Sequence, residues 1–380
     1  MSGVPSGGIA APARGSDAAV PAGGRVGKTL LSLDMVVAPG LRTPQQSMVS
    51  DEAAAEPGVA DGAGSPPPSI VTLTMNPAID VTTNAARVVP DIKLRCESPS
   101  YEAGGGGINV ARAIRRLGGD ALALFPAGGP AGALLGQLLT GEDVRYRCLP
   151  VIGWTRQNVN VTEAATGRQF RFVMPGPVLA QREWHALLDV LDAFERPPRF
   201  LVASGSLPPG VPADFYARLA RMARQRGFAL VLDASGDPLR QAVAEGVYLL
   251  KPSLHEFEEL TGSHGCEESR LVELGRRLVD DGRCEVLVLS LGERGVLWMS
   301  ATEHGRLVPP AVSVKSSVGA GDSMVAGIVW SLTGGHTLAD AVRFGVAAGA
   351  ASVMNSGTEL CRAGDVERLY TQVAALPSSR

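Results

Sequence analysis

The chain is poor in the features that mark several classes of protein. Aromatic residues make up 5% of its 380 positions, and the four tryptophans are dispersed, which argues against a stacking platform for single-stranded nucleic acid. The formal net charge is -3, so no overall field attracts nucleic acid or an anionic membrane. No apolar run approaches the roughly 18 to 20 residues that span a bilayer, and the N-terminus lacks a basic segment leading into an apolar one. We therefore expect a cytoplasmic protein without a nucleic-acid or membrane partner.

Cysteine and histidine are also sparse. The five cysteines include no CxxC pair, and the five histidines show no HxH or HExxH spacing. These patterns argue against a zinc site and against a disulfide framework, so we expect reduced thiols and give no histidine a catalytic role.

Residues 1–68 differ in composition from the rest of the chain. They contain 11 Gly, 9 Pro and 12 Ala, and no Phe, Tyr or Trp. Such a segment cannot bury enough apolar surface to offset the entropy lost on ordering. We expect a disordered tail over 1–68, followed by one folded domain over 69–376.

From residue 69 onward, short β-rich apolar runs alternate with longer stretches of helical period. This pattern is typical of an α/β fold: a doubly wound, mostly parallel sheet with helices on both faces. Strands are predicted over 70–75, 121–125, 200–203, 229–233, 247–251, 286–290 and 296–299. Helices are predicted over 108–117, 181–194, 212–225, 254–260, 269–281, 321–332 and 338–354.

Two regions, at about 81–100 and 155–175, break this alternation. They carry strand-like residues with polar alternation and no intervening helix, as in Gln169-Phe170-Arg171-Phe172. We expect a small antiparallel sheet that acts as a lid at the mouth of the main sheet. A plain surface hairpin is the alternative.

The most informative motif is Ser317-Val318-Gly319-Ala320-Gly321-Asp322-Ser323, directly before an apolar helical run. Small residues let main-chain N–H groups converge at the helix N-terminus, where the helix dipole favours an anion. Such a donor cluster stabilises a phosphoryl group during transfer, and Asp322 is placed to accept a proton from an attacking hydroxyl. The alternative is an ordinary N-capped turn, since Asp is common at helix starts.

A second motif, Gly104-Gly105-Gly106-Gly107-Ile108-Asn109, also precedes a helix. Consecutive glycines let a ligand approach the main chain, and the Asn109 amide offers both a donor and an acceptor to sugar hydroxyls. Asp80 follows the first strand, at the carboxyl edge where open α/β sheets bind ligands. A flexible loop and a capped turn are the alternatives for these two segments.

Basic residues gather on the predicted lid. A phosphate dianion favours several cationic side chains, above all the planar guanidinium fork. The candidates are Lys93, Arg95, Arg156 and Arg171.

Together these residues resemble the ribokinase-like family of phosphosugar kinases. Six segments occur in the order found in that family: 72–80, 104–109, 154–158, 172–176, 204–210 and 317–323. Within the family, residues 93–96, the glycine run, 154–158 and 343–349 most resemble the minor bacterial ATP-dependent 6-phosphofructokinases. The resemblance implies transfer of the ATP γ-phosphoryl group to the 1-hydroxyl of fructose 6-phosphate. A 1-phosphofructokinase, a tagatose-6-phosphate kinase and a non-catalytic sugar-phosphate sensor are the alternatives.

The resemblance also assigns roles to residues. Asp322 is the base, and the amides of Gly319, Ala320 and Gly321 form the anion hole. The sugar is held by Asp80, Gly104, Gly105, Asn109 and Ser206, and its phosphate by Arg156, Arg171, Lys93 and Arg95. The nucleotide lies near Lys251, Ser253, Ser290, Gly292, Gly295, Ser317, Gly319 and Gly321. Glu256 orders Mg²⁺ through water, K⁺ is a candidate monovalent cation, and a homodimer forms through the lid.

Two positions depart from the family pattern. Ser253 stands three residues before Glu256, where relatives generally carry Asn, and this leaves magnesium affinity open. Glu359 stands where close relatives tend to carry Arg, and this leaves the monovalent-cation effect open.

Overall fold

The structure is a computed structural model that describes residues 69–355, 357 and 359–376. The tail predicted over 1–68 lies outside the described residues. Among the described helices, none is long and apolar enough to cross a membrane.

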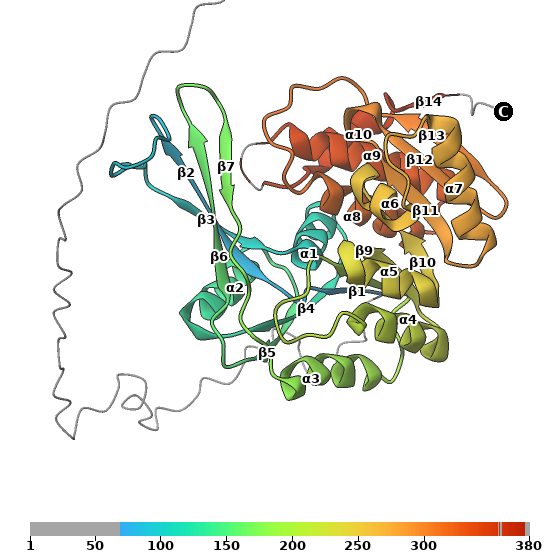
Figure 1. Ribbon diagram of the computed structural model, residues 1–380, viewed down its shortest axis with the longest axis horizontal. Coiled ribbons are helices and arrows are strands. Elements are labelled where there is room, and N and C mark those ends of the chain that lie inside the picture. The colour runs from blue at the N-terminus through green and yellow to red at the C-terminus, as the bar shows by residue number, and fades with distance from the viewer. Residues whose placement is uncertain (1–68, 356, 358, 377–380) are drawn as a thin grey trace, which may run out of the picture. The chain divides into compact units, whose positions relative to one another are not determined.

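A ten-stranded sheet forms the centre of the fold (Figure 1). Seven neighbouring strands run parallel, and the last three of the chain add antiparallel at one edge, which confirms the mostly parallel sheet. In spatial order the strands are β14 (Ala374–Leu376), β13 (His304–Val308), β12 (Val296–Ser300), β11 (Cys284–Ser290), β10 (Val247–Leu250), β9 (Ala229–Asp233), β8 (Phe200–Ser204), β1 (Ile70–Leu73), β4 (Leu122–Ala127) and β5 (Tyr146–Pro150).

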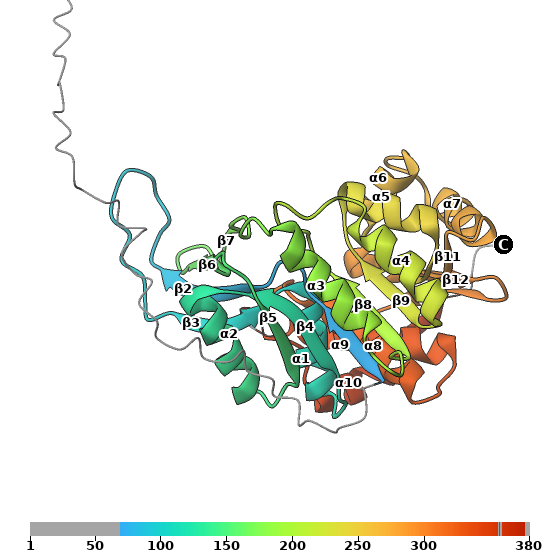
Figure 2. The same ribbon diagram turned by 90° about the horizontal axis from the view of Figure 1, so that it is seen from below.

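Helices cover both faces of this sheet because alternate side chains of each buried strand point to opposite sides (Figure 2). In β8, Phe200 and Val202 join one hydrophobic cluster, whereas Leu201 and Ala203 join the other. The first cluster packs against α1 (Gly106–Arg116), α2 (Gly129–Gly141), α8 (Ala320–Thr333), α9 (Leu338–Val353) and α10 (Ala363–Tyr370). The second packs against α3 (Gln181–Asp192), α4 (Phe215–Arg226), α5 (Gly236–Glu245), α6 (Leu254–Thr261) and α7 (Glu268–Asp280).

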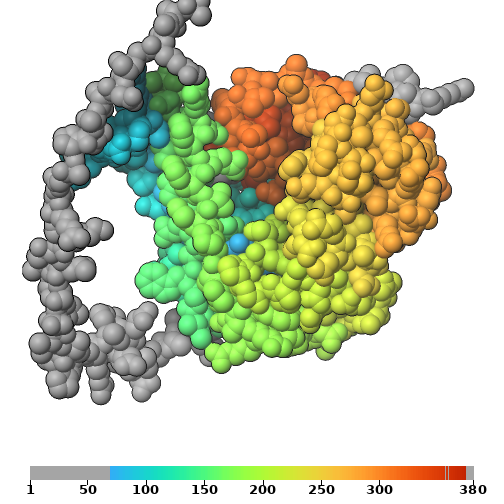
Figure 3. Space-filling view, viewed as in Figure 1, coloured from blue at the N-terminus to red at the C-terminus, as the bar shows by residue number. Residues whose placement is uncertain are grey.

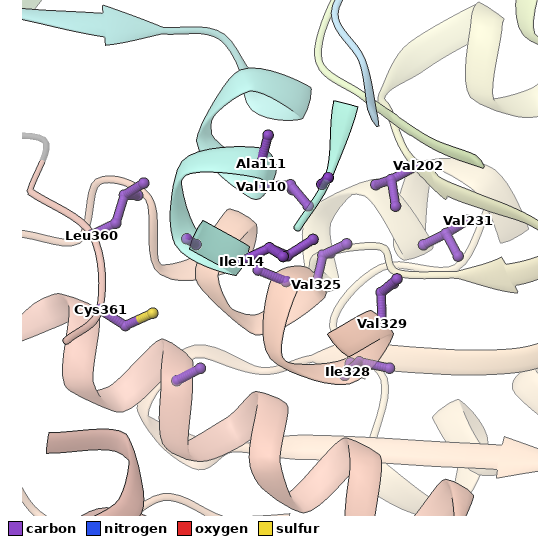
Figure 4. Close-up of a cluster of buried hydrophobic side chains, with 14 of the residues drawn as sticks. Val110, Ala111, Ile114, Val202, Val231, Val325, Ile328, Val329, Leu360 and Cys361 are labelled. Carbon is purple, nitrogen blue, oxygen red and sulfur yellow. The ribbon is translucent and has the colours of Figure 1, made fainter. Parts of the chain in front are cut away.

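Helices α1 and α8 pack against each other in the first cluster. Figure 4 shows Val110 and Ile114 of α1 beside Val325 and Ile328 of α8, and all four side chains are fully buried. This contact sets the two helix N-termini beside each other.

A separate four-stranded sheet has the order β3 (Ser100–Gly104), β2 (Ala78–Ala85), β6 (Arg156–Glu163) and β7 (Gln169–Phe172). The two outer pairs are antiparallel, as expected, because each is a hairpin of strands close in sequence. The central pair, β2 with β6, corrects the expectation because it runs parallel. The chain between these two strands crosses the main sheet through α1, β4, α2 and β5, and such a long connection permits the parallel direction.

Candidate active site

The candidate site lies at the carboxyl ends of the parallel strands, where the strand order changes direction. Strand β1 is flanked by β4 on one side and by β8 on the other, and open α/β sheets bind ligands at such a switch point. Figure 3 shows the surface hollowed between the green segment of the small sheet and the yellow and orange segments. A cleft here is lined by Gly106, Ser204, Gly205, Ser206, Asp233, Ala234, Ser235, Glu256 and Asp322.

One wall of the cleft is the N-terminus of α8. Its N-cap residue, Gly319, has a φ of 73°, a left-handed conformation that glycine adopts without strain. The preceding turn is fixed by the buried Ser316 hydroxyl, which accepts from the Val318 N–H and donates to the Gly357 carbonyl. The first N–H groups of a helix have no partner within the helix, so this end presents donors and a partial positive charge.

Asp322 sits in the first turn of α8 and is partly buried. Its carboxylate accepts from Asn109 Nδ2 at 3.0 Å and from the Ser204 hydroxyl at 3.5 Å. Burial, together with the negative charge of Asp233, raises the pKa of Asp322 from 3.8 to about 6, against the lowering effect of Asn109, Lys251 and Ser204. A carboxyl group with that pKa is ionised at neutral pH and still basic enough to receive a proton.

A buried ion pair, which the sequence did not reveal, lies beneath this helix end. Lys251 Nζ lies 3.1 Å from Asp233 Oδ1, and their side chains are 6% and 15% exposed. The Lys251 ammonium is also 3.5 Å from the position that a Cβ on Gly321 would occupy. Lys251, predicted near the nucleotide, thus adds positive charge beneath the N-terminus of α8. Asp233 itself could have been singled out in the sequence, because it is the last residue of the strand predicted over 229–233 and so lies at the carboxyl edge of the sheet.

Asp80 lies in β2 of the small sheet, beside the glycine run that leads into α1. It is 7% exposed and accepts from Asn158 Nδ2 at 2.8 Å. Burial raises the pKa of Asp80, while the Asn158 hydrogen bond and the Arg156 charge oppose the rise. Gly104 of β3 pairs with Ala78 of β2, and a side chain on Gly104 would collide with the Asp80 carboxylate.

The remaining glycines of the 104–107 run permit close main-chain packing. Gly105, the N-cap of α1, has a φ of 112°, and a Cβ on Gly106 would collide with the Ser204 hydroxyl. These glycines therefore bring the start of α1 against the end of β8, so that Asn109 reaches Asp322.

Two further candidate residues lie close to this group. The exposed Ser206 accepts from Asn76 Nδ2 at 3.2 Å. Arg156 donates to the main-chain carbonyls of Asn76 and Met174, each at 2.9 Å, while its buried Nε has no hydrogen-bond partner among the described residues. Arg156 is thus held at the junction of the two sheets.

The other basic candidates lie farther out. Arg171 pairs with Asn160 across the small sheet, and Asn160 with Thr82, so Arg171 is on the same face as Asp80 and exposed. Lys93 and Arg95 lie in the exposed segment between β2 and β3, next to the bridge of Ala85 with Cys96. Ala85 is five residues beyond Asp80 on β2, roughly 17 Å away. A single chain does not bring Lys93 and Arg95 to the cluster.

The candidates expected near the nucleotide follow β10 and β11. Ser253 caps α6: its hydroxyl accepts from the Glu256 N–H at 3.3 Å, and Glu256 Oε2 accepts from the Ser253 N–H at 2.7 Å. The serine at this position is therefore a helix cap that orients Glu256 toward the cleft. Ser290 bonds the Pro252 carbonyl, and Gly292 and Gly295 both have positive φ in the next turn.

The cleft offers hard oxygen donors. No group of three or more His, Cys, Asp and Glu side chains within the described residues is arranged to hold a metal ion. The carboxylates of Asp233 and Glu256 line the cleft, and oxygen ligands of this kind suit Mg²⁺, which keeps several waters and shares its shell with substrate phosphates.

Comparisons with known proteins agree with this geometry. Residues 70–363 match the "pfkB family carbohydrate kinase". The chain is 46% identical over 311 residues to the ATP-dependent 6-phosphofructokinase isozyme 2 of Mycobacterium tuberculosis, covering 82% of this chain and 91% of the relative. It is 40% identical over 306 residues to the Escherichia coli isozyme 2, covering 80% and 99%. A crystal structure of phosphofructokinase-2 from Escherichia coli in complex with potassium matches with a TM-score of 0.77 at 41% identity, covering 80% and 98%. The chain is therefore a member of the pfkB family of carbohydrate kinases, an ATP-dependent sugar kinase.

Proposed function

We propose that this kinase is an ATP-dependent 6-phosphofructokinase, which converts fructose 6-phosphate and ATP into fructose 1,6-bisphosphate and ADP. The observation that carries the proposal is the Asp322 carboxylate in the first turn of α8, with a pKa of about 6, bonded to Asn109 and above the buried Lys251. The relatives named isozyme 2 support the sugar, and the Escherichia coli protein has been solved in complex with fructose-6-phosphate. A relative named 1-phosphofructokinase is less similar, at 34% identity.

In the proposed reaction Asp322 receives the proton of the 1-hydroxyl. The hydroxyl oxygen forms a bond to the γ-phosphorus, the bond from that phosphorus to the bridging oxygen breaks, and ADP leaves. The amides of Gly319, Ala320 and Gly321 stabilise the charge on the migrating group, and Lys251 adds to the field from below. Charge stabilisation by preorganised donors needs no rearrangement during the transfer.

The sugar phosphate is proposed to lie between α1 and the small sheet. Asp80 and Asn109 accept from and donate to its hydroxyls, Gly104 and Gly105 allow close approach, and Ser206 closes the pocket. Arg156, held at the junction of the two sheets, and Arg171, on the same sheet face as Asp80, bind the phosphate dianion.

The nucleotide is proposed to lie along the ends of β10 and β11, near Ser253, Ser290, Gly292, Gly295 and Ser317. Mg²⁺, held by the ATP phosphates and through water by Glu256, would neutralise their charge when bound. Potassium, with which the Escherichia coli protein was crystallised, is the proposed monovalent cation. Here Glu359 is paired with Arg362 at 2.6 Å and with Arg116 at 3.9 Å.

We also propose a cytoplasmic homodimer formed through the small sheet, which would act as a lid. Ile92, Leu94, Tyr101 and Phe172 are exposed apolar side chains of this sheet and its loop, at 64%, 37%, 47% and 48%. A second copy would cover them and would bring its own Lys93 and Arg95 to the phosphate. The Escherichia coli protein has been solved as a tetrameric inhibited form.

The test is ADP release, measured with a coupled assay over fructose 6-phosphate, fructose 1-phosphate, tagatose 6-phosphate, fructose and ribose. We expect the highest kcat/KM with fructose 6-phosphate. A higher value with fructose 1-phosphate or tagatose 6-phosphate would reassign the substrate, and binding of a sugar phosphate without ADP release would indicate a sensor.

A further inference from the structure

A buried arginine lies behind the candidate site and takes no part in the roles described so far. Arg112 is on α1, one turn after Asn109, and only 1% of it is exposed. Residues three apart on a helix lie on the same face, so the guanidinium and the Asn109 amide are neighbours.

Each edge of the guanidinium has a partner. Nε and Nη2 donate to the carboxylate of Glu142, the C-cap residue of α2, at 3.0 and 2.6 Å. Nη1 donates to the Ala103 carbonyl at 2.7 Å and lies 3.4 Å from Asn109 Oδ1. A buried guanidinium needs such partners, because an uncompensated buried charge is strongly destabilising.

The contact at Nη1 decides which way the Asn109 amide points. Arginine has donors only, so the amide atom that faces it must be the oxygen. The amide nitrogen then faces the Asp322 carboxylate, where the distance is 3.0 Å. Turned over, Asn109 would present its oxygen to the carboxylate and its NH₂ group to the guanidinium, and both contacts would be repulsive.

Building on the proposed function, we infer that Arg112 is a positioning residue, which holds the Asn109 amide in the orientation that donates to the catalytic base. The same guanidinium also fixes the small sheet, because Ala103 directly precedes Gly104 and Arg112 Nη2 lies 3.7 Å from Glu102, the residue paired with Asp80. Arg112 thereby contacts both Asn109, which donates to Asp322, and the strand that is paired with Asp80.

A merely structural role is the competing explanation, and the chain offers a matched control. Arg306 is 8% exposed, bonds the Glu268 carboxylate through Nε at 3.1 Å, and bonds the Leu307 carbonyl through Nη1. It is a second buried arginine paired with a partly exposed glutamate, in β13, next to the edge strand of the main sheet. Arg306→Met should lower stability and leave the ionisation of Asp322 unchanged.

The experiment compares Arg112→Met and Arg112→Lys with Arg306→Met in the full chain. The lysine keeps a charge beside Glu142 but lacks the fork that also reaches Asn109, so it remains informative if the methionine variant does not fold. The readout is the acid limb of the pH profile of kcat/KM, which reports the base of the free enzyme. Loss of one hydrogen bond to a carboxylate should move this limb up by about one pH unit.

Asp322 is faced by Asn109 from α1, Ser204 from β8, Asp233 from β9 and Lys251 after β10, so the route of the effect must be isolated. In an Asn109→Ala background, Arg112→Lys should no longer move the limb if Arg112 acts through the amide. An equal shift in both backgrounds would show direct charge action and overturn the inference, as would an unmoved limb in both Arg112 variants.

A second readout needs no substrate. The pKa of Asp322 also follows from the pH dependence of the stability difference between chains with and without Asp322→Asn. If the sugar panel gave no turnover, this measurement would still decide the role of Arg112. The failure of the proposed activity and the failure of this inference are therefore distinguishable.

Discussion

Replacing Asp322 by asparagine should sharply lower turnover and, at neutral pH, stabilise the fold. The pKa of Asp322 is raised from 3.8 to about 6, so the folded chain holds a proton that the unfolded chain has lost between these values. Ionisation of this carboxyl therefore imposes a penalty on the stability of the folded chain. The penalty is absent well below pH 3.8, grows as pH rises to 6, and is constant above, where it is worth about 3 kcal/mol. The asparagine side chain carries no charge and escapes this penalty.

The substitution has a smaller cost that does not depend on pH. The carboxylate accepts from both Asn109 and Ser204, whereas an asparagine side chain has one oxygen, and loss of one such hydrogen bond costs about 1 kcal/mol. The variant should thus be less stable than the parent by about 0.5 kcal/mol at pH 4 and more stable by about 2 kcal/mol at pH 8. Turnover should fall roughly 10²- to 10⁴-fold.

The assay is urea unfolding of both chains at intervals from pH 4 to pH 8, with Asp189→Asn on an exposed site of α3 as the control. The control should leave stability unchanged at every pH. A stability difference for Asp322→Asn that keeps one sign and one size over the whole range would refute the raised pKa and the reasoning that makes Asp322 a base. Near-normal turnover would refute the catalytic role.

Three other predictions follow from the site. Asp233→Ala leaves the Lys251 ammonium buried without its partner and should destabilise the fold by about 3 to 5 kcal/mol in urea unfolding; a smaller loss when Lys251→Met is added would verify that the cause is the orphaned charge. Glu256→Gln keeps an oxygen to cap α6, so the melting temperature should stay unchanged while the Mg²⁺ concentration for half-maximal rate rises; an unchanged Mg²⁺ requirement would exclude Glu256 from metal binding. Mixing Lys93→Ala and Asp322→Asn chains after joint refolding should restore roughly a quarter of wild-type activity, since half the dimers carry one complete site, and no recovery would contradict a site shared between two copies.

The sequence predicted the central elements well where strand and helix patterns were strong. The strand over 229–233 has the bounds of β9, and the helices over 254–260 and 338–354 differ from α6 and α9 by one residue each. Helix α2 was missed because glycines stand among its apolar residues, at Gly129, Gly132 and Gly136. The helix also packs against the small sheet, so its sequence shows no alternation of apolar and polar faces. Helix α5 was missed because Gly236 and Pro238 at its start are typical of a turn.

Only part of the candidate site could be predicted from the sequence. The glycine motifs and Asp322 could be found because each is a local pattern at a helix start. The Lys251–Asp233 pair and the Arg112–Glu142 pair join segments far apart in sequence, and their contact depends on strand order and helix packing. The parallel pairing of β2 with β6 was hidden for the same reason, since no local signal gives the direction of strands joined by a long connection.

The contact between α1 and α8 bears on how the specificity of this enzyme can be changed in the laboratory. The side chains that join these helices are fully buried, and on the far side of α8, Gly327 lies so close to α9 that an added Cβ would come within 3.0 Å of Ala348. The helices that carry Asn109 and Asp322 therefore tolerate few substitutions in their interior. Directed evolution toward another sugar should accumulate its mutations in the exposed positions of β6 and β7, where a changed side chain disturbs no interior packing.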